Sequence, residues 1–195
     1  MPDTQQLVLA STSPFRKAIL QKLNVPFDTA SPDVDESRRD DESPAELVAR
    51  LSAMKAQAVA AEFPEAIIIG SDQVACIDDQ ILGKPGTHEN AVTQLQHASG
   101  RSVLFYTGLC VFNANTGIAH TEVETFEVVF RKLNDEKIEN YLRAEEPYNC
   151  AGSFKSEAMG IALFEKLHGD DPNTLIGLPL IRLVRLLEEE GMRVI

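Results

Sequence analysis

Cysteine is scarce in this chain of 195 residues: only Cys76, Cys110 and Cys150 are present, and no two of them form a CxxC pair. An odd number of unclustered cysteines argues against a disulfide framework or a structural zinc site, and it indicates a reducing compartment. Long hydrophobic runs are missing as well, and the N-terminus has no basic segment followed by an apolar one. We therefore expect no membrane span and no signal peptide, and we predict a cytoplasmic protein with no membrane partner.

Positive charge is also in short supply, with 18 Lys and Arg residues against 30 Asp and Glu residues and a net charge of −12. A surface of this sign repels nucleic acid and anionic membranes, so we expect no nucleic-acid partner. An anionic ligand would need locally gathered cations or a metal ion. Neither a Walker A loop nor a GxGxxG pattern occurs in the sequence, which argues against a P-loop enzyme or a classical dinucleotide-binding enzyme.

Strand-like and helix-like segments alternate along the chain, which predicts one domain over residues 1–195, with room for two lobes. Apolar or alternating segments predict strands at 7–10, 66–70 continued by 74–77, 81–82, 102–112, 121–131 and 161–167, with a turn at Asp78-Asp79. Capped segments predict helices that begin near residues 14, 44, 87, 134 and 179, and polar segments predict loops at 26–42, 147–160 and 170–177. Because 102–112 and 121–131 form a hairpin, the predicted fold class is α/β with a mixed sheet.

The first strand and the first helix meet in a hydroxyl-rich turn. Leu7–Ala10 is followed by Ser11-Thr12-Ser13, and then Ser13 suits the N-cap and Pro14 the first helical position. The free N–H groups and the positive end of the helix dipole make such a turn an anion site. Arg16 in the first helical turn is unfavourable to the dipole unless an anion is held between them. The alternative is a plain capped junction with a solvated Arg16.

Three charged side chains stand in unusual places. Lys55 lies on the apolar stripe of the helix that follows the capping box Ser43–Glu46, either as a functional cation or as a lysine snorkelling at the stripe's edge. Asp72 emerges from an apolar strand, where it can bind a metal, orient a water or act as a general base; otherwise it is a turn aspartate bonded to its own backbone. Lys84 in Gly-Lys-Pro suits phosphate binding, although such turns are also common on surfaces.

Further candidates lie in the predicted loops. Asp35 and Glu36 are acidic residues of the loop 26–42, and Ser153, Lys155 and Glu157 alternate on a segment predicted to be extended, which lines either a base pocket or a solvated loop. Phosphoryl chemistry on a polyphosphate requires such a set, because cations and N–H donors hold charge and carboxylates hold a divalent metal. These residues do not identify the substrate.

Several longer motifs run through nearly the whole chain: LASTSPFR at 9–16, VDE at 34–36, KA at 55–56, SDQ at 71–73, GKP at 83–85, FYTG at 105–108, AGSFKSEAMG at 151–160 and DPNTLIGLP at 171–179. Together they resemble the Maf family of nucleoside-triphosphate pyrophosphatases. Any one of these motifs alone is not specific, whereas the set is.

The resemblance implies a Mg²⁺- or Mn²⁺-dependent hydrolase that cleaves between the α- and β-phosphates of a nucleoside triphosphate and releases pyrophosphate. It also implies a homodimer with a fold similar to that of the inosine-triphosphate pyrophosphatases, with two lobes around a cleft. Carried over by motif, Asp72 is the proton acceptor and a metal ligand, and Glu36 assists the metal site. The residues that the resemblance assigns to phosphate binding are Ser11, Ser13, Arg16, Lys55 and Lys84.

Within the family, SDQ together with AGSFKSE resembles the subgroup that removes 7-methyl-GTP, with selectivity positions at Phe15, Gln73 and Glu157. The Phe15 ring can stack on the cationic 7-methylguanine, and the Glu157 carboxylate can accept the guanine N1–H and N2–H pair. Tryptophan is common in the subgroup at the position of Phe15 and stacks more strongly, so we expect looser selectivity here. The rival predictions are a dTTP/UTP pyrophosphatase of the same family and a nucleotide-binding regulator of cell division.

Overall fold

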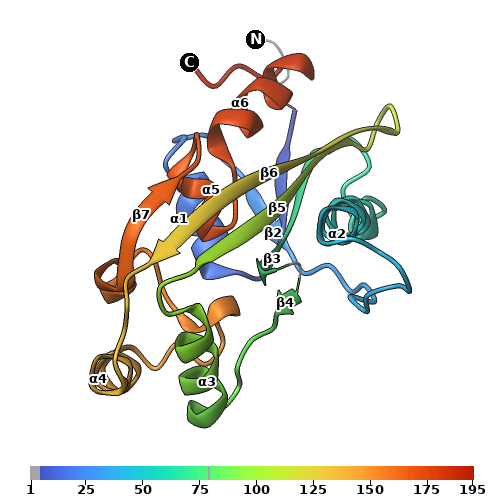
Figure 1. Cartoon of the computed structure of the whole chain (residues 1–195). Helices are drawn as coiled ribbons and strands as arrows, with labels where there is room; N and C mark the ends of the chain where they lie inside the picture. The colour runs from blue at the N-terminus through green and yellow to red at the C-terminus, as the bar shows by residue number, and fades with distance from the viewer. Residues whose placement is uncertain (1–4, 79) are drawn as a thin grey trace. The chain divides into compact units, whose positions relative to one another are not determined.

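The computed structural model describes residues 5–78 and 80–195, in which the chain forms two compact units. The first unit consists of Met1–Gln73, Thr107–Glu124 and Asp171–Ile195, and the second consists of Val74–Tyr106 and Thr125–Asp170. Figure 1 labels the elements along the chain. Within the described ranges, none of the helices combines the length and the apolar character needed to cross a membrane.

The described strands form a seven-stranded mixed sheet in the order β2-β1-β3-β5-β6-β7, with β4 paired to β3. Strand β1 pairs in parallel with β2 and β3, whereas β4 and β7 run antiparallel to β3 and β6. The strands are β1 (Leu7–Ala10), β2 (Asp28–Ala30), β3 (Ile67–Ile77), β4 (Gln80–Leu82), β5 (Ser102–Asn113), β6 (Ile118–Phe130) and β7 (Phe164–His168). The predicted α/β class with a mixed sheet is confirmed.

The helices begin close to the predicted starts, except for the short helix Pro172–Ile176, which was not predicted. They are α1 (Pro14–Gln21), α2 (Pro44–Ala58), α3 (His88–Ala98), α4 (Asp135–Glu145), α5 (Pro172–Ile176) and α6 (Leu180–Glu189), with 3₁₀ turns η1 (Ala151–Ser153) and η2 (Met159–Leu163). The side chains of the N-caps of α1 to α4 each accept a hydrogen bond from the backbone N–H three residues on; these N-caps are Ser13, Ser43, Thr87 and Asn134. Each bond satisfies one of the free N–H groups of a helix start.

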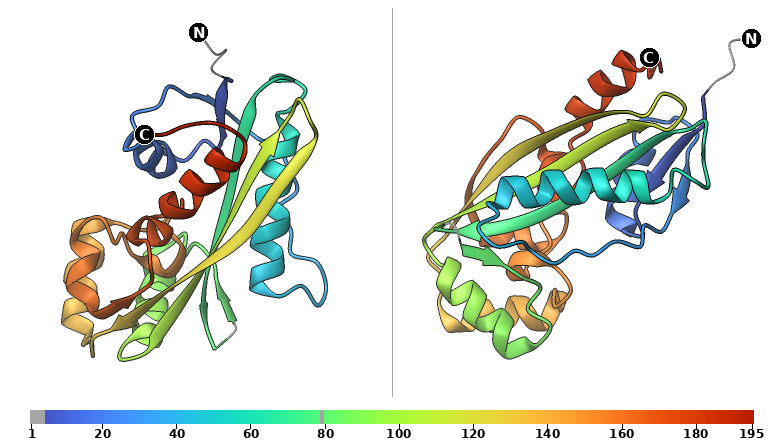
Figure 2. Two further views of the ribbon diagram at one scale, coloured as in Figure 1. Left: turned by 90° about the horizontal axis from the view of Figure 1, so that it is seen from above. Right: turned by 90° about the vertical axis from the view of Figure 1, so that its right-hand side faces the viewer.

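The central strands of the first unit bury both faces, which explains their unbroken apolar sequence. Odd-numbered residues such as Leu9 and Ile69 pack with Leu20 of α1 and Leu183 of α6, and even-numbered residues such as Ile68 pack on the opposite face with Ala56 of α2. Figure 2 shows α2 on one side of these strands and α1 and α6 on the other. The helix that carries Lys55 is therefore packed directly on the strand that carries Asp72.

The second unit is held by an aromatic cluster and by a helix pair. Phe105, Phe130, Phe154 and Phe164 contact one another edge to face, with ring centroids 5.0 to 5.5 Å apart in the contacting pairs. Helices α3 and α4 pack together, and the ring of His88 joins them through Glu139, with Nε2 2.8 Å from Oε2. Edge-to-face contacts of this kind add to the stability that the burial of the rings provides.

Three predictions of loop or strand are wrong in part. The loop predicted at 26–42 contains β2, whose three partly exposed residues lack the alternation that predicts a strand, and the loop predicted at 170–177 contains α5. The strand predicted at 161–167 begins only at Phe164, because residues 161–163 belong to η2. Glu157 lies in a turn between η1 and η2 and not on an extended segment. Asp79, half of a predicted turn, lies outside the described residues.

Candidate functional site

The ammonium group of Lys55 lies between two carboxylates in the first unit. Its Nζ is 2.6 Å from Oδ1 of Asp72, at the end of the first buried stretch of β3, and 2.7 Å from Oε1 of Glu36 in the loop before α2. Only 7% of Lys55 and 8% of Asp72 are exposed, so neither charge is solvated in the ordinary way. The lysine on the apolar stripe is therefore a paired, buried cation, and the snorkelling alternative is wrong for Lys55.

Two glycines let the backbone of α2 approach the sheet closely enough to make this pair. A Cβ atom on Gly70 would lie 2.1 Å from the carbonyl oxygen of Ser52, and one on Gly108 would lie 2.2 Å from that of Val48. Both distances are far inside van der Waals contact, so only glycine permits the observed separation of helix and strands. Because Gly70 lies two residues before Asp72, its contact with α2 helps to determine the Lys55–Asp72 distance.

The turn between β1 and α1 carries two of the hydroxyl groups predicted to bind phosphate. The Oγ of Ser11 accepts from the N–H of Ser13 at 3.2 Å, and the Oγ of Ser13 accepts from the N–H of Arg16 at 3.4 Å. Each hydroxyl thus uses its oxygen locally and keeps its proton for donation to an anion. The predicted strand–cap–helix junction is confirmed, while phosphate binding at Ser11 and Ser13 stays a prediction.

Arg16 does not extend into solvent from α1. Its Nε donates to the carbonyl oxygen of Gly177 at 2.9 Å, and Ser71 Oγ donates to the same oxygen at 2.9 Å. Burial lowers the pKa of the Arg16 guanidinium, and the negative charges of Asp72 and Glu36 oppose that shift. An arginine guanidinium stays charged at physiological pH even in this setting. Because the backbone of Gly177 holds the Arg16 side chain, the alternative of a solvated Arg16 is wrong.

Gln73, the residue after Asp72, binds the end of α5 through its amide group. Its Nε2 donates to the carbonyl oxygens of Thr174 at 2.7 Å and Leu175 at 3.2 Å, and to Oγ1 of Thr107 at 2.8 Å. Thr107 in turn donates to the carbonyl oxygen of Thr174 at 3.0 Å. The predicted selectivity position is therefore tied to a helix that the sequence did not predict.

The ring of Phe15 is accessible. Phe15 is the second residue of α1, and 40% of its surface is exposed, although large apolar side chains are usually buried. An exposed ring in the first turn of a helix next to hydroxyl groups can stack on a flat ligand. Its role in selectivity stays a prediction.

The remaining predicted residues belong to the second unit and are solvent-exposed. Lys84 lies in the loop between β4 and α3, and Glu157 lies in the turn between η1 and η2. Burial raises the pKa of the Cys150 thiol, and the charges of Lys84 and Glu157 act on that thiol with opposite sign, so both lie near it. Within its unit, the structure thus gathers Lys84 and Glu157 into one neighbourhood.

Two neighbours of Glu157 serve the fold. The Nζ of Lys155 donates to the carbonyl oxygen of Glu145 at 2.6 Å, at the C-terminal end of α4, and the hydroxyl of Ser153 donates to Gln94 Oε1. A cation at a helix C-terminus satisfies carbonyls that the helix leaves free. These bonds give Ser153 and Lys155 structural roles, while their part in a base pocket stays a prediction.

The loop that carries Glu36 is anchored by a residue that the sequence analysis missed. Arg50 of α2 binds Glu42 with both ends of its fork, at 2.6 Å and 2.8 Å, and donates to the carbonyl oxygen of Ser37 at 3.0 Å. The hydrogen bond from Arg50 lowers the pKa of Glu42 from its ordinary 4.5 to about 2. Nothing in the local sequence identifies Arg50 as an anchor, because its partners lie 8 and 13 residues away.

Asp72 and Glu36 are the carboxylates that suit a divalent cation. Both place an oxygen within hydrogen-bond distance of one Nζ atom, and hard oxygen ligands are those that Mg²⁺ and Mn²⁺ prefer. Among the residues that the structure describes, no group of three or more His, Cys, Asp and Glu side chains gathers into a metal site. Two carboxylates fit a Mg²⁺ ion that takes its other ligands from water and phosphates, which is the usual arrangement.

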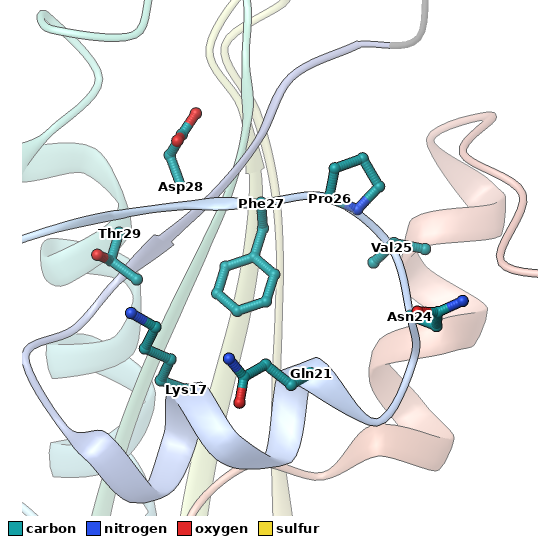
Figure 3. Close-up of a pocket in the computed structure, with 8 residues that line it drawn as sticks. All are labelled: Lys17, Gln21, Asn24, Val25, Pro26, Phe27, Asp28 and Thr29. Atoms are coloured by element: carbon teal, nitrogen blue, oxygen red, sulfur yellow. The ribbon is translucent and has the colours of Figure 1, made fainter.

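A separate pocket of about 790 Å³ lies in the first unit between α1 and β2. Figure 3 shows Lys17 and Gln21 rising from the helix towards Thr29 and Phe27 on the opposite wall. None of the residues that line it belongs to the sets predicted for catalysis, phosphate or metal binding, or selectivity. The pocket therefore does not coincide with the candidate site around Asp72.

Comparison with known proteins covers nearly the whole chain. The model of the family described as Maf-like protein matches residues 6–190. A 7-methyl-GTP pyrophosphatase of Colwellia psychrerythraea is 59% identical over 97% of this chain and 94% of its own length. Proteins of the same name from Nitrosococcus oceani and Pseudoalteromonas translucida are 55% and 58% identical, over 100% and 97% of this chain and 98% and 94% of their own lengths.

Solved structures give more distant likenesses. The Staphylococcus aureus Ham1 protein is 13% identical with a TM-score of 0.47, covering 65% of this chain and 72% of that one. A Vibrio cholerae protein is 12% identical with a TM-score of 0.42, covering 95% of this chain and 98% of that one. Similarity of sequence, and not of solved structure, therefore identifies the relatives of this chain.

Proposed function

The chain belongs to the family of Maf-like proteins, and from this premise we propose that it is a hydrolase that converts 7-methyl-GTP to 7-methyl-GMP and pyrophosphate. The substrate is that named for three relatives that are 55% to 59% identical over nearly the whole chain. Removing such a nucleotide keeps modified guanine out of the triphosphate pool. In the same proposal, the bond broken is the anhydride between the α- and β-phosphates.

One structural observation carries the chemistry: the buried Asp72 carboxylate, with Lys55 bound to its Oδ1 atom. We propose that Asp72 accepts a proton from the water that attacks the α–β anhydride. The bound ammonium holds the carboxylate in place, and this keeps an oxygen aimed at the water. The leaving pyrophosphate carries the bridging oxygen away, and cations neutralise its growing charge.

The phosphate contacts that we propose come from several segments. Ser11 and Ser13 donate their hydroxyl protons at the N-terminus of α1, where the helix dipole favours an anion. Arg16 is held by the Gly177 carbonyl through Nε, so its terminal nitrogens can donate to phosphate oxygens. Lys55 and Lys84 supply further positive charge, Lys55 from a buried position and Lys84 from an exposed one.

Selectivity is proposed to rest on Phe15, Gln73 and Glu157. The exposed ring of Phe15 stacks on the cationic 7-methylguanine. Glu157 accepts the guanine N1–H and N2–H pair, whereas uracil and thymine do not offer such a pair of donors. The methyl group at N7 thus acts through the charge that it places on the ring.

A divalent cation, Mg²⁺ or Mn²⁺, is part of the proposal. Asp72 and Glu36 would hold it, and when bound it would neutralise charge on the phosphates. Lys55 contacts both carboxylates, so it must share or release them when a metal is bound. Titration of the protein with Mn²⁺, followed by water-proton relaxation, tests this without turnover: Glu36→Gln is expected to weaken binding, and unchanged binding would contradict it.

We also propose a cytoplasmic location and a homodimer. All three cysteines are thiols, and burial raises the pKa of Cys110 and of Cys150, so both are poorly reactive in a reducing compartment. The homodimer rests on the family resemblance. Light scattering at several protein concentrations tests it, and a mass of one chain throughout would contradict it.

The experiment for the proposed function measures pyrophosphate release from 7-methyl-GTP, GTP, UTP and dTTP at equal concentration, with Mg²⁺ and then with Mn²⁺. We expect 7-methyl-GTP to be preferred over GTP, because the two differ in the charge at N7. A preference for UTP or dTTP would keep the reaction and overturn the substrate. No release from any nucleotide would favour a nucleotide-binding regulator, which nucleotide binding without turnover would then identify.

A further inference from the structure

The end of α5 presents backbone carbonyl oxygens to side chains of the candidate site. A helix leaves its last four carbonyls without partners in the helix, and α5 is only five residues long. The carbonyl oxygens of Thr174 and Leu175 accept from Gln73, that of Thr174 also accepts from Thr107, and that of Gly177 accepts from Arg16 and Ser71. Side chains of the site therefore take their orientation from one short helix.

These bonds determine which way the Gln73 amide points. Carbonyl oxygens only accept hydrogen bonds, so the amide atom that faces Thr174 and Leu175 must be the NH₂ group. The single proton of Thr107 is used by the carbonyl oxygen of Thr174, so its Oγ1 atom faces Gln73 as an acceptor. An amide turned the other way would place its oxygen against two carbonyl oxygens and would require the Thr107 proton to leave the carbonyl oxygen of Thr174.

We propose that Thr107 is a positioning residue that fixes the Gln73 amide, so that Gln73 offers only its carbonyl oxygen to the nucleotide. Thr107 is fully buried, with 0% of its surface exposed, so it acts through Gln73 and not by touching the ligand. The inference rests on the proposed function, because it concerns how the selectivity position of that reaction is set.

A fixed acceptor selects the part of the nucleotide that it meets. Phosphate oxygens would be repelled by the Gln73 carbonyl oxygen, whereas a hydroxyl or an amino N–H group would donate to it. The group recognised at Gln73 is therefore a hydrogen-bond donor of the nucleoside. This contact contributes to binding of the nucleoside. It is separate from the proton transfer proposed for Asp72.

The test compares Thr107→Val with Thr107→Ser. Valine removes the hydroxyl and keeps the branched shape, so we expect KM for 7-methyl-GTP to rise roughly threefold to tenfold with kcat nearly unchanged, the effect of one lost hydrogen bond in binding. Serine restores the hydroxyl and is expected to return KM close to the original value. Thr93→Val is the matched control, because it removes a hydroxyl that donates to Glu89 within α3.

A second measurement does not depend on turnover. In the original protein, the two Nε2 protons of Gln73 are expected to give separate NMR signals that exchange slowly with water, and Thr107→Val is expected to speed their exchange. Unchanged KM together with unchanged exchange in Thr107→Val would overturn the inference. If the original protein hydrolyses no nucleotide, the proposed function fails, while the exchange measurement still decides whether Thr107 positions Gln73.

Discussion

Lys55 and Lys84 are both predicted to bind phosphate, yet the structure holds them differently. Lys55, in the first unit, is 7% exposed and contacts two carboxylates from the last turn of a 15-residue helix. Lys84, in the second unit, is exposed and lies in the loop between β4 and α3. The same contrast separates the buried Asp72 from the exposed Glu157.

The buried charges and the exposed charges are expected to contribute differently to stability and to ligand binding. A buried, paired charge is part of the fold, so a change there alters stability as well as chemistry. An exposed charge on a loop can be replaced with little cost to folding, so a change there alters only ligand binding. Substitutions in the two units should therefore differ in whether activity and stability change together.

The largest expected effect comes from Asp72→Asn. Losing the proposed proton acceptor is expected to lower kcat about 10³-fold, as measured by pyrophosphate release. Asp28→Asn is the matched control, because that exposed carboxylate of β2 binds only Gln6 among the described residues. Near-full turnover by Asp72→Asn would remove the proposed role of Asp72.

Lys55→Met and Lys84→Met compare the two units directly. Removing Lys55 leaves the buried Asp72 carboxylate without its cation, so we expect unfolding by urea to show a loss of about 3 kcal/mol together with lost activity. Lys84→Met is expected to lose activity with an unchanged unfolding curve. Equal stability of the two variants would contradict the expected difference between buried and exposed lysines.

Gly70→Ala tests the approach of α2 to the sheet. The added Cβ would meet the carbonyl oxygen of Ser52 at 2.1 Å, so the helix must move, at a cost of about 3 kcal/mol. We expect a lower midpoint of thermal unfolding and at least roughly tenfold less activity, since Lys55 moves with the helix. Gly83→Ala is the control for stability, because its Cβ would meet nothing within 4 Å. Equal midpoints in the two variants would show that α2 can move away from the sheet without a loss of stability.

Glu157→Gln tests whether an exposed residue of the second unit affects ligand binding without affecting stability. The amide keeps the size of the side chain and removes the charge proposed to accept the guanine N–H pair, so KM for 7-methyl-GTP is expected to rise about tenfold. Because Glu157 is exposed, the thermal midpoint should not change. A fall in stability with an unchanged KM would identify Glu157 as a structural residue.

The smallest expected effect is the loss at low pH of the stability that the Glu42–Arg50 pair contributes. The pKa of Glu42 is lowered from 4.5 to about 2, so the native state favours the carboxylate and binds fewer protons than the unfolded state between these pH values. The stability that the pair contributes is complete above pH 4.5 and is lost as the pH falls towards 2. We expect Glu42→Gln to be less stable at pH 7, with a difference that shrinks below pH 4.5. A difference that stays constant down to pH 2 would contradict this account.

The sequence predicts those parts of the fold that depend on neighbouring residues. The capping box Ser43–Glu46 and the Ser13-Pro14 start of α1 are local signals, and both are confirmed. Helix α5 is missed although Asp171 and Pro172 form a local capped start, because it has only five residues and its carbonyls accept from Gln73 and Thr107, which lie 67 to 102 residues away in the sequence. Strand β2 is missed because its three partly exposed residues give no periodic pattern.

The candidate site shows the same limit. Lys55 and Asp72 are each unusual in the sequence, but only the structure shows that they are partners, 17 residues apart. Thr107 and Gly177 lie in family motifs, yet their hydrogen bonds to Gln73 and Arg16 follow from tertiary packing. Arg50 has no local signal at all. The residues that position the site were therefore harder to predict than the residues expected to act in it.

Lys55 also has a consequence for the charge of the site as a whole. Lys55 and Arg16 carry two positive charges, and Asp72 and Glu36 carry two negative charges, so this group is electrically neutral before any ligand arrives. On a chain of net charge −12, a polyanionic nucleotide would gain no net attraction from these four residues, which leaves Lys84 as the further cation proposed for the phosphates. We therefore expect the complex of the nucleotide with a divalent cation, and not the free anion, to be the form that binds best.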